Sequence, residues 1–357
     1  MGTENRQPPG GGSNALGIDS IEQWLADVTG LHRPMTWIQL AGGHSNLTFR
    51  VEGFDGTAIV VRRPPVGRLQ HAAHDMHREF RVISALWPTE VSVPKPIAIT
   101  EDPTHTDAPT YAMQWVEGRT PYSRRDIEDY LDLDARDRLS RSFIDTLAAL
   151  HSLDPDTVGL GDLGKRTSYL ERQLHSWHKS LQASSPSGAD ERLERIHRLL
   201  VEHRPPTGPV SLVHGDYGLH NCRVTAEGDV AAVIDWEIST LGDPLADLAY
   251  CVNAWVEDPS ETEVASSAPT SLPGFWGRQR LLDRYADATG ADLSAYDYYR
   301  CFNQWKLACI VTGVVSRYEN GNKESRGVNL DRLRTRITVA VDLALEAADN
   351  LSGAVNR

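Results

Sequence analysis

The stretch that decides the fold is LVHGDYGLHN, residues 212–221, which is followed by VIDWE at residues 233–237. An apolar segment leads into a His-Gly-Asp triplet ending at Asp216, and Asn221 follows five positions later. A second aspartate, Asp235, ends another apolar run. Because a predicted hairpin starts after Asn221 and folds back to Asp235, we expect these two residues to lie side by side. The stretch therefore predicts two carboxylates and one amide around a common point.

Those three side chains suit chemistry on a phosphate that is held by a metal ion. Mg²⁺ prefers hard oxygen ligands, usually one or two carboxylates completed by phosphate oxygens and water. Asn221 and Asp235 fit that role, which leaves Asp216 to orient an attacking hydroxyl or to accept its proton. The same residue types also serve as turn and capping residues. The Asp-x4-Asn spacing, typical of the protein-kinase catalytic loop, favours phosphoryl transfer.

The rest of the sequence predicts an α+β, two-lobed chain. The Gly, Pro and Ser content of residues 1–17 predicts a disordered tail. Residues 18–114 predict a small β-rich lobe, with a short first helix, several strands and one long helix over residues 74–86. Residues 115–357 predict a larger lobe, mostly helical, that contains the hairpin at residues 222–235. With 357 residues, the chain is long enough for each lobe to have its own core.

Composition excludes some classes of partner. The formal net charge is −13, which argues against nucleic acid, because such binders need a basic face. No stretch is long and apolar enough to suggest a membrane partner. The four cysteines form no C-x-x-C pair, and the N-terminus lacks the apolar core of a signal peptide. We therefore expect buried, reduced thiols in a cytoplasmic protein, and leave its oligomeric state open.

The motifs resemble a known family. LVHGDYGLHNCRV and AAVIDWEISTLGDPLADLAY, within residues 212–250, resemble the signature of the aminoglycoside phosphotransferase and choline kinase family, a branch of the protein-kinase-like fold. Residues 60–86 are similar to the kinase-like domains associated with acyl-CoA dehydrogenases. The resemblance implies a Mg²⁺- and ATP- or GTP-dependent kinase acting on the hydroxyl of a small molecule. It implies that Asp216 is catalytic and that Asn221 and Asp235 are metal ligands.

The resemblance also implies a nucleotide site in the N-terminal lobe. The turn AGGHSN would place Gly43, Ser45 and Asn46 at the phosphates, where glycine permits close backbone approach. The family's third strand normally supplies a lysine, but the sequence here is AIVVRRPP, so Arg62 takes that position. Arginine can pair with phosphate through two nitrogens. Glu79, on the following helix, is the expected partner of Arg62.

The sequence also predicts where adenine binds, which residue caps a helix and which residue braces the catalytic loop. TYAMQWVEG resembles the strand that joins the lobes, so adenine is expected to bond backbone groups near Gln114, Trp115 and Val116. Asp243, before a proline, is expected to cap a helix. Asp247 is expected to brace the catalytic loop through hydrogen bonds.

The phosphate acceptor and two other functions stay open. An acidic loop at residues 255–263 would suit an aminoglycoside-like alcohol, whereas many arginines in the later helices suit a hydroxyacyl-CoA. The arginine at position 62 also allows a nucleotide-binding regulatory module without catalysis, a pseudokinase. A metal-dependent hydrolase using His214, Asp216 and Asp235 lacks further ligands in the sequence.

Overall fold

The computed structural model describes residues 18–40, 46–65, 69–185, 188, 190–257, 267–320 and 328–354, without the side chains of 69–75 and 352–354. The predicted tail and most of the glycine turn, including Gly43 and Ser45, lie outside these residues. The packing of the chain divides it into two units. Unit 1 comprises Met1–Tyr122, Asp126–Thr146 and Leu219–Ile238, and unit 2 comprises Ser123–Arg125, Leu147–Gly218 and Ser239–Arg357. The lobe boundary after residue 114 stays a prediction, because these packing units follow a different division.

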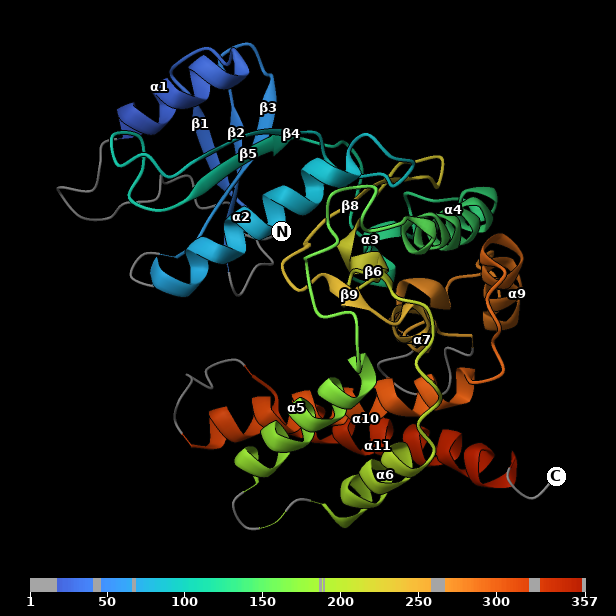
Figure 1. Ribbon diagram of the computed structural model, residues 1–357. Coiled ribbons are helices and arrows are strands. Elements are labelled where there is room, and N and C mark those ends of the chain that lie inside the picture. The colour runs from blue at the N-terminus through green and yellow to red at the C-terminus, as the bar shows by residue number, and fades with distance from the viewer. Residues whose placement is uncertain are drawn as a thin grey trace. The chain divides into compact units, whose positions relative to one another are not determined.

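Unit 1 contains a five-stranded antiparallel sheet (Figure 1). Its strands run in the order β1-β2-β3-β5-β4 and comprise Thr36–Gln39 (β1), Leu47–Glu52 (β2), Ala58–Arg63 (β3), Pro96–Thr100 (β4) and Thr110–Gln114 (β5). The central strand β3 has the sequence AIVVRR and is buried over most of its length. β-Branched residues such as Ile and Val favour strands because they pack well on a pleated surface.

Two helices pack against this sheet. Helix α1 (Ile18–Thr29) buries Trp24 and Leu25 in one cluster with Val61 of β3. Because side chains alternate along a strand, the next residue, Arg62, points to the opposite face. Helix α2 (Leu69–Leu86) contacts β4 and β5 and carries Glu79, the partner of Arg62. The face of the sheet toward α2 therefore carries the charged Arg62, whereas the face toward α1 is apolar.

A hairpin completes unit 1. Strands β7 (Cys222–Val224) and β8 (Val230–Val233) pair antiparallel, with Cys222 opposite Val233. Helix α4 (Leu133–Ser152) supports the hairpin, since the Val230 N–H donates to the Ser142 hydroxyl at 2.9 Å. A one-turn helix, α3 (Arg124–Ile127), precedes α4. The short 3₁₀ turn Leu219–Asn221 leads directly into β7.

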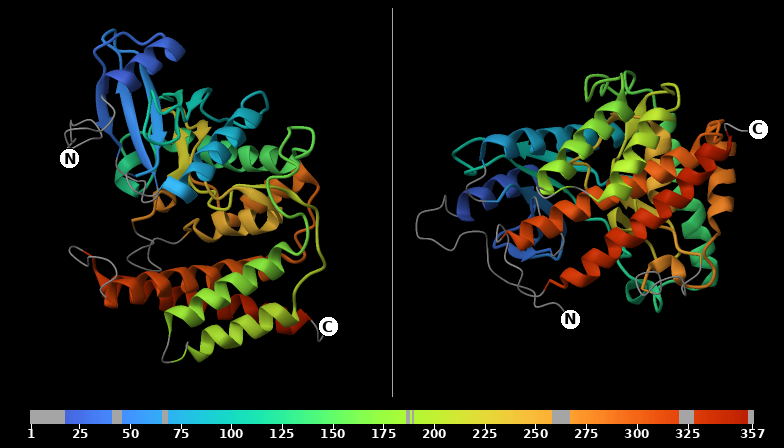
Figure 2. Two further views of the ribbon diagram at one scale, coloured as in Figure 1. Left: turned by 60° about the vertical axis from the view of Figure 1, so that its left-hand side comes forward. Right: turned by 90° about the horizontal axis from the view of Figure 1, so that it is seen from below.

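Unit 2 is mostly helical. Helices α10 and α11 lie side by side, and α5 and α6 pack against α10, as the views in Figures 1 and 2 show. Their bounds are Tyr169–Ser184 (α5), Glu191–Glu202 (α6), Pro244–Asn253 (α7), Arg278–Thr289 (α9), Tyr296–Glu319 (α10) and Leu330–Ala354 (α11). Leu193, Ile196 and Leu200 recur at helical spacing on α6 and enter one core with Trp305 of α10. None of the helices in the described ranges is long and apolar enough to span a membrane.

Unit 2 also holds a small two-stranded sheet. Strand β6 (Ser211–Val213) pairs antiparallel with β9 (Thr240–Gly242), and a 3₁₀ turn follows later at Pro269–Ser271. Helix α7 begins immediately after β9, with Pro244 in its first turn. The Asp243 carboxylate accepts the Leu245 N–H at 3.1 Å, which confirms the predicted helix cap.

The described elements confirm the α+β class, with a β-rich N-terminal part and a mostly helical remainder. Strand β5 ends at Gln114, four residues earlier than the predicted strand at 110–118, and helix α2 begins at Leu69 instead of residue 74. Elements α3 and β9 were not predicted, because each has only one turn or three residues. All four cysteines are buried thiols, as expected.

Candidate active site

Arg62 links two carboxylates in unit 1. Its Nη1 contacts Glu79 Oε1 of α2 in an ion pair, and its Nη2 donates to Asp235 Oδ1 at 3.1 Å. The side chains of Arg62 and Glu79 are 7% and 0% exposed. Each partner comes from a different element, so strand β3, helix α2 and the end of the β7–β8 hairpin meet at one guanidinium. The expected pairing of Arg62 with Glu79 is present.

Burial affects the pKa values of both Glu79 and Arg62. Removal from water raises the pKa of Glu79 to about 7, although the Arg62 charge opposes the shift. Burial also works against the charged guanidinium, but Glu79, Tyr111 and Asp235 together hold the pKa of Arg62 above its usual value. Glu79 further accepts the backbone N–H of Trp236 at 3.3 Å. The buried carboxylate therefore fixes both the arginine and the backbone beside Asp235.

Asp235 and Asn221 are brought together by the hairpin backbone. The Ile234 N–H donates to the Asn221 carbonyl at 2.9 Å, so the residue before Asp235 pairs with Asn221. Asp235 has φ 67°, in the left-handed region that costs energy for residues other than glycine, and Asp tolerates it better than most. Asn221 is buried. A carboxylate and an amide at adjoining backbone positions match the oxygen donors that Mg²⁺ prefers.

One residue of the glycine turn is described. Asn46 is buried and donates its side-chain N–H to Glu237 Oε2 at 3.2 Å. Glu237 follows Asp235 by two positions. The end of the glycine turn is therefore tied to the segment that carries Asp235, within the same unit.

The segment after β5 is held by a residue that the sequence did not reveal. Arg223 of β7 donates to the Val116 carbonyl at 3.2 Å and contacts the Gly118 carbonyl. The Trp115 ring lies near the guanidinium carbons of Arg50 and Arg223, at 4.8 Å and 5.1 Å. The Gln114 N–H donates to the Lys95 carbonyl at 2.8 Å. The Gln114 N–H and the Val116 carbonyl already have partners within the protein. Adenine recognition at Gln114, Trp115 and Val116 therefore stays a prediction about the remaining backbone groups.

Asp216 lies in unit 2, in the loop after β6. The Tyr250 hydroxyl of α7 donates to Asp216 Oδ1 in a short hydrogen bond. Burial, followed by the Asp216 charge, raises the pKa of Tyr250 far above its usual value, so the phenol keeps its proton. The Asp216 N–H also donates to His214 Nδ1 at 3.3 Å. One oxygen of the predicted catalytic carboxylate is thereby fixed in orientation.

Asp247 braces this loop, as expected from the sequence. Its carboxylate accepts the backbone N–H groups of His214 at 2.5 Å and Gly215 at 2.9 Å. Burial acts to raise the pKa of Asp247, but hydrogen bonding and the charge of His151, with contributions from His214 and Gly215, lower it overall. The His151 ring in turn lies 2.8 Å from the Tyr285 hydroxyl. The loop that carries Asp216 is therefore pinned to α7 by an ionised carboxylate.

A partly buried lysine lies in the same region of unit 2. Lys306 Nζ of α10 is 5.9 Å from the ring centre of Tyr250 and 5.8 Å from that of Trp177. Burial lowers the pKa of Lys306, while the charges of Asp247 and Asp216 oppose that shift. The surroundings of Asp216 therefore contain a lysine amine as well as carboxylates.

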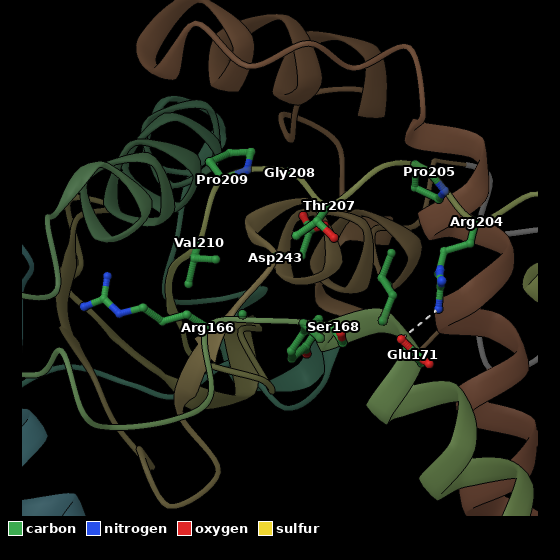
Figure 3. Close-up of a pocket in the computed structure, with 13 residues that line it drawn as sticks. Arg166, Ser168, Glu171, Arg204, Pro205, Thr207, Gly208, Pro209, Val210 and Asp243 are labelled. Carbon is green, nitrogen blue, oxygen red and sulfur yellow. Dashed lines mark ion pairs between the residues drawn. The ribbon is translucent and has the colours of Figure 1, made fainter.

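Unit 2 also has a small pocket that was not predicted (Figure 3). It lies beside Asp243, with Ser168 and Thr207 in its lining and an ion pair of 3.3 Å between Arg204 and Glu171 at one side. Its volume is about 80 Å³, well below the several hundred Å³ of typical small-molecule sites. The pocket is too small for a nucleotide and contains none of the predicted site residues.

The predicted site residues thus fall into two described groups. Arg62, Glu79, Asn221 and Asp235 gather in unit 1, and Asp216 belongs to unit 2. Sequence reasoning missed Tyr250, Lys306 and Arg223. For two of these residues, the sequence did contain a feature that could have indicated them. Tyr250 follows Asp247 by one helical turn, which places both on one face of α7, and Lys306 is the only charged residue in an apolar run of α10.

Comparisons with known proteins agree with this picture. The model of the "Phosphotransferase enzyme family" matches residues 36–299. The chain is 34% identical over 302 residues to "Probable acyl-CoA dehydrogenase IBR3" of Arabidopsis thaliana, covering 80% of the chain and 36% of that protein. It is 31% identical over 325 residues to acyl-CoA dehydrogenase family member 10 of Mus musculus, covering 87% and 29%. The chain thus spans about a third of the length of these curated relatives.

A solved structure extends the similarity to three dimensions. The crystal structure of a candidate aminoglycoside phosphotransferase from Ralstonia eutropha JMP134 superposes with a TM-score of 0.79 and 26% sequence identity. The match covers 94% of this chain and 98% of that one. The shared fold therefore extends well beyond the motifs at residues 212–250.

Proposed function

The chain belongs to the phosphotransferase enzyme family, and on that basis we propose that it is a kinase that transfers the γ-phosphate of ATP or GTP to a hydroxyl of a small molecule. The family and its two-lobed, protein-kinase-like fold are those expected from residues 212–250. The observation that carries the proposal is that the buried Arg62 contacts both Glu79 and Asp235. These contacts hold the Arg62 guanidinium beside Asp235, a predicted metal ligand. Phosphoryl transfer requires such positive charge near the phosphates that the metal binds.

The proposed roles follow from the two described groups. In unit 1, Asn221 and Asp235 would hold Mg²⁺, which supplies neutralisation of phosphate charge when bound. Arg62 would contact the phosphates, and Asn46 would fix the end of the glycine turn near them. In unit 2, Asp216 would orient the acceptor hydroxyl and accept its proton.

We further propose that the acceptor is an anionic alcohol of the hydroxyacyl-CoA class. Lys306 is a partly buried amine whose pKa is influenced by Asp216 and Asp247, and the exposed Arg336 acts through its charge on Tyr250. A polycationic aminoglycoside would meet repulsion from these groups, whereas an anionic thioester would be attracted. Two relatives named as acyl-CoA dehydrogenases support the same substrate class.

A phosphate-transfer screen tests both statements. Purified protein with Mg²⁺ and either ATP or GTP is offered hydroxyacyl-CoAs, choline-like alcohols, sugars and aminoglycosides, and the phosphorylated product is identified by mass spectrometry. We expect transfer to a hydroxyacyl-CoA, and its loss in Asp216→Asn by roughly a hundred-fold or more. Lys306→Met should raise KM for the anionic acceptor more than for a neutral alcohol. Lys179→Met, at an exposed position of α5, is the matched control.

The same screen distinguishes the proposed kinase from a regulatory module that only binds nucleotide. A nucleotide-binding regulatory module would bind Mg·ATP and phosphorylate none of the acceptors. Transfer to aminoglycosides alone would retain the kinase and overturn the acceptor class.

A further inference from the structure

Helices α5 and α6 bring two histidines and a glutamate together in unit 2, in a cluster separate from the residues discussed above. His178 Nε2 lies 2.9 Å from Glu194 Oε2 and 3.1 Å from Oε1. The rings of His178 and His197 stack in parallel, with centroids 3.9 Å apart and an interplanar angle of 7°. One ligand atom from each of the three residues lies within 4.8 Å of the others. Three donors of metal-binding type therefore converge at the α5–α6 contact.

The cluster rests on a packed core. His197 stacks on Trp305 of α10, with ring centroids 5.4 Å apart, and the Trp305 indole N–H donates to the Leu193 carbonyl of α6 at 3.1 Å. Trp305 and Leu193 are almost completely buried. Glu194 and His197 are three residues apart, which places them on one face of α6. The core thus fixes the rotation of α6 and keeps this pair directed toward His178.

The chemistry of the three donors suits a metal cation. A neutral imidazole offers the lone pair that a metal needs. Glu194 adds the negative charge that attracts a cation.

We propose that His178, Glu194 and His197 form a binding site for a divalent transition metal of the Zn²⁺ class. Zn²⁺ binds His nitrogen and Glu oxygen at about 2.0–2.2 Å in tetrahedral geometry. Three protein ligands would leave a fourth position for water. To reach that geometry the donors need to move closer, and the His178 and His197 rings need to turn out of their parallel stack so that one nitrogen of each faces the metal. Such a site would join α5 to α6 independently of the Mg²⁺ site proposed at Asn221 and Asp235.

Metal titration of the 357-residue chain tests this site. Protein stripped with a chelator is titrated with Zn²⁺ by calorimetry, with excess Mg²⁺ and no nucleotide, and Co²⁺ absorption reports tetrahedral coordination. We expect one Zn²⁺ per chain and a rise in Tm when the metal binds. Glu194→Gln and His197→Gln should each weaken binding on the order of tenfold or more, since even groups behind the ligands change metal affinity that much. Circular dichroism verifies that both variants fold.

Two controls make the result decisive. His175→Gln changes an exposed histidine of the same helix and should leave Zn²⁺ affinity unchanged. Asp235→Asn should also retain Zn²⁺ binding. The proposal is overturned if wild-type protein binds no Zn²⁺, or if folded His197→Gln and Glu194→Gln bind it as tightly as wild type. Loss of binding in Asp235→Asn alone would assign the metal to the other site.

Discussion

Glu79 is a fully buried carboxylate whose ionisation should make stability depend on pH. Burial raises its pKa from 4.5 to about 7 in the folded chain. A raised pKa means that the folded state binds the proton more tightly than the unfolded state, so the stabilisation is complete at low pH and is lost as pH rises toward 7. At about 1.4 kcal/mol per pKa unit, the loss between about pH 5 and about pH 8 is on the order of 2 kcal/mol.

Glu79→Gln removes this titration. The free energy of unfolding of wild type, relative to the variant, should therefore fall by that amount between the two pH values, as measured by urea unfolding. Glu90→Gln, at an exposed position, is the matched control. A difference between wild type and Glu79→Gln that stays constant with pH would contradict the raised pKa.

The sequence identified the site residues that a motif specifies, but it predicted only some of the contacts between those residues. The pairing of Arg62 with Glu79 was expected, but the sequence did not indicate that one guanidinium also reaches Asp235. Arginine can contact two acids through different nitrogens, which a lysine ammonium cannot do in the same fork geometry. Such a contact joins residues 173 positions apart, and local sequence patterns carry no information on it.

At the scale of elements, the close approach of Gly118 to strand β7 decides how the chain leaves β5. Gly118 has φ +124°, and a Cβ atom there would overlap the Val224 carbonyl oxygen. Arg119 and Val224 exchange backbone hydrogen bonds of 2.8 Å in each direction, so neither segment can move away cheaply. Gly118→Ala should therefore cost about 3 kcal/mol or more, from backbone strain and overlap together.

Urea unfolding of Gly118→Ala measures this cost. Gly56→Ala serves as the matched control, because Gly56 also has positive φ, at +82°, but no atom lies within 4 Å of the position that an alanine methyl would take. The control should lose only the roughly 1–2 kcal/mol of a left-handed alanine. Equal losses in the two variants would show that the approach to Val224 carries no energetic penalty.

The long elements were predictable because periodicity determines them. Helix α6 has buried leucines and isoleucine at helical spacing and an aspartate cap, Asp190, that accepts the Arg192 N–H at 2.9 Å. Strand β9 has three residues, and only its pairing with β6 makes it a strand. Strand β5 ends at Gln114 because Arg223 binds the carbonyls of Val116 and Gly118, which no local pattern indicates.

At the scale of the whole molecule, the residues proposed to bind Mg²⁺ and phosphate and those proposed to act on the acceptor belong to different packing units. Unit 1 holds Arg62, Asn221 and Asp235, and unit 2 holds Asp216 with Tyr250. The roles of Asp216 and Asn221 were predicted from one contiguous stretch, because these residues are only five positions apart, whereas Tyr250 was not predicted. The sequence could not predict the passage from one unit to the other between Gly218 and Leu219, since that depends on which contacts each side makes.

This division predicts that binding and transfer can be separated by mutation. Asp235→Asn should weaken Mg·ATP binding, because it removes a ligand charge and a partner of Arg62, while asparagine keeps the left-handed backbone at φ 67°. Asp216→Asn should leave Mg·ATP affinity within about threefold and reduce turnover by roughly a hundred-fold or more, because this carboxylate acts on the acceptor. Calorimetry with Mg·ATP and a turnover assay on the same preparations provide both quantities. If Asp216→Asn loses nucleotide affinity as strongly as Asp235→Asn, the acceptor role of Asp216 is wrong, since removing a group that acts only on the acceptor cannot weaken nucleotide binding to that extent.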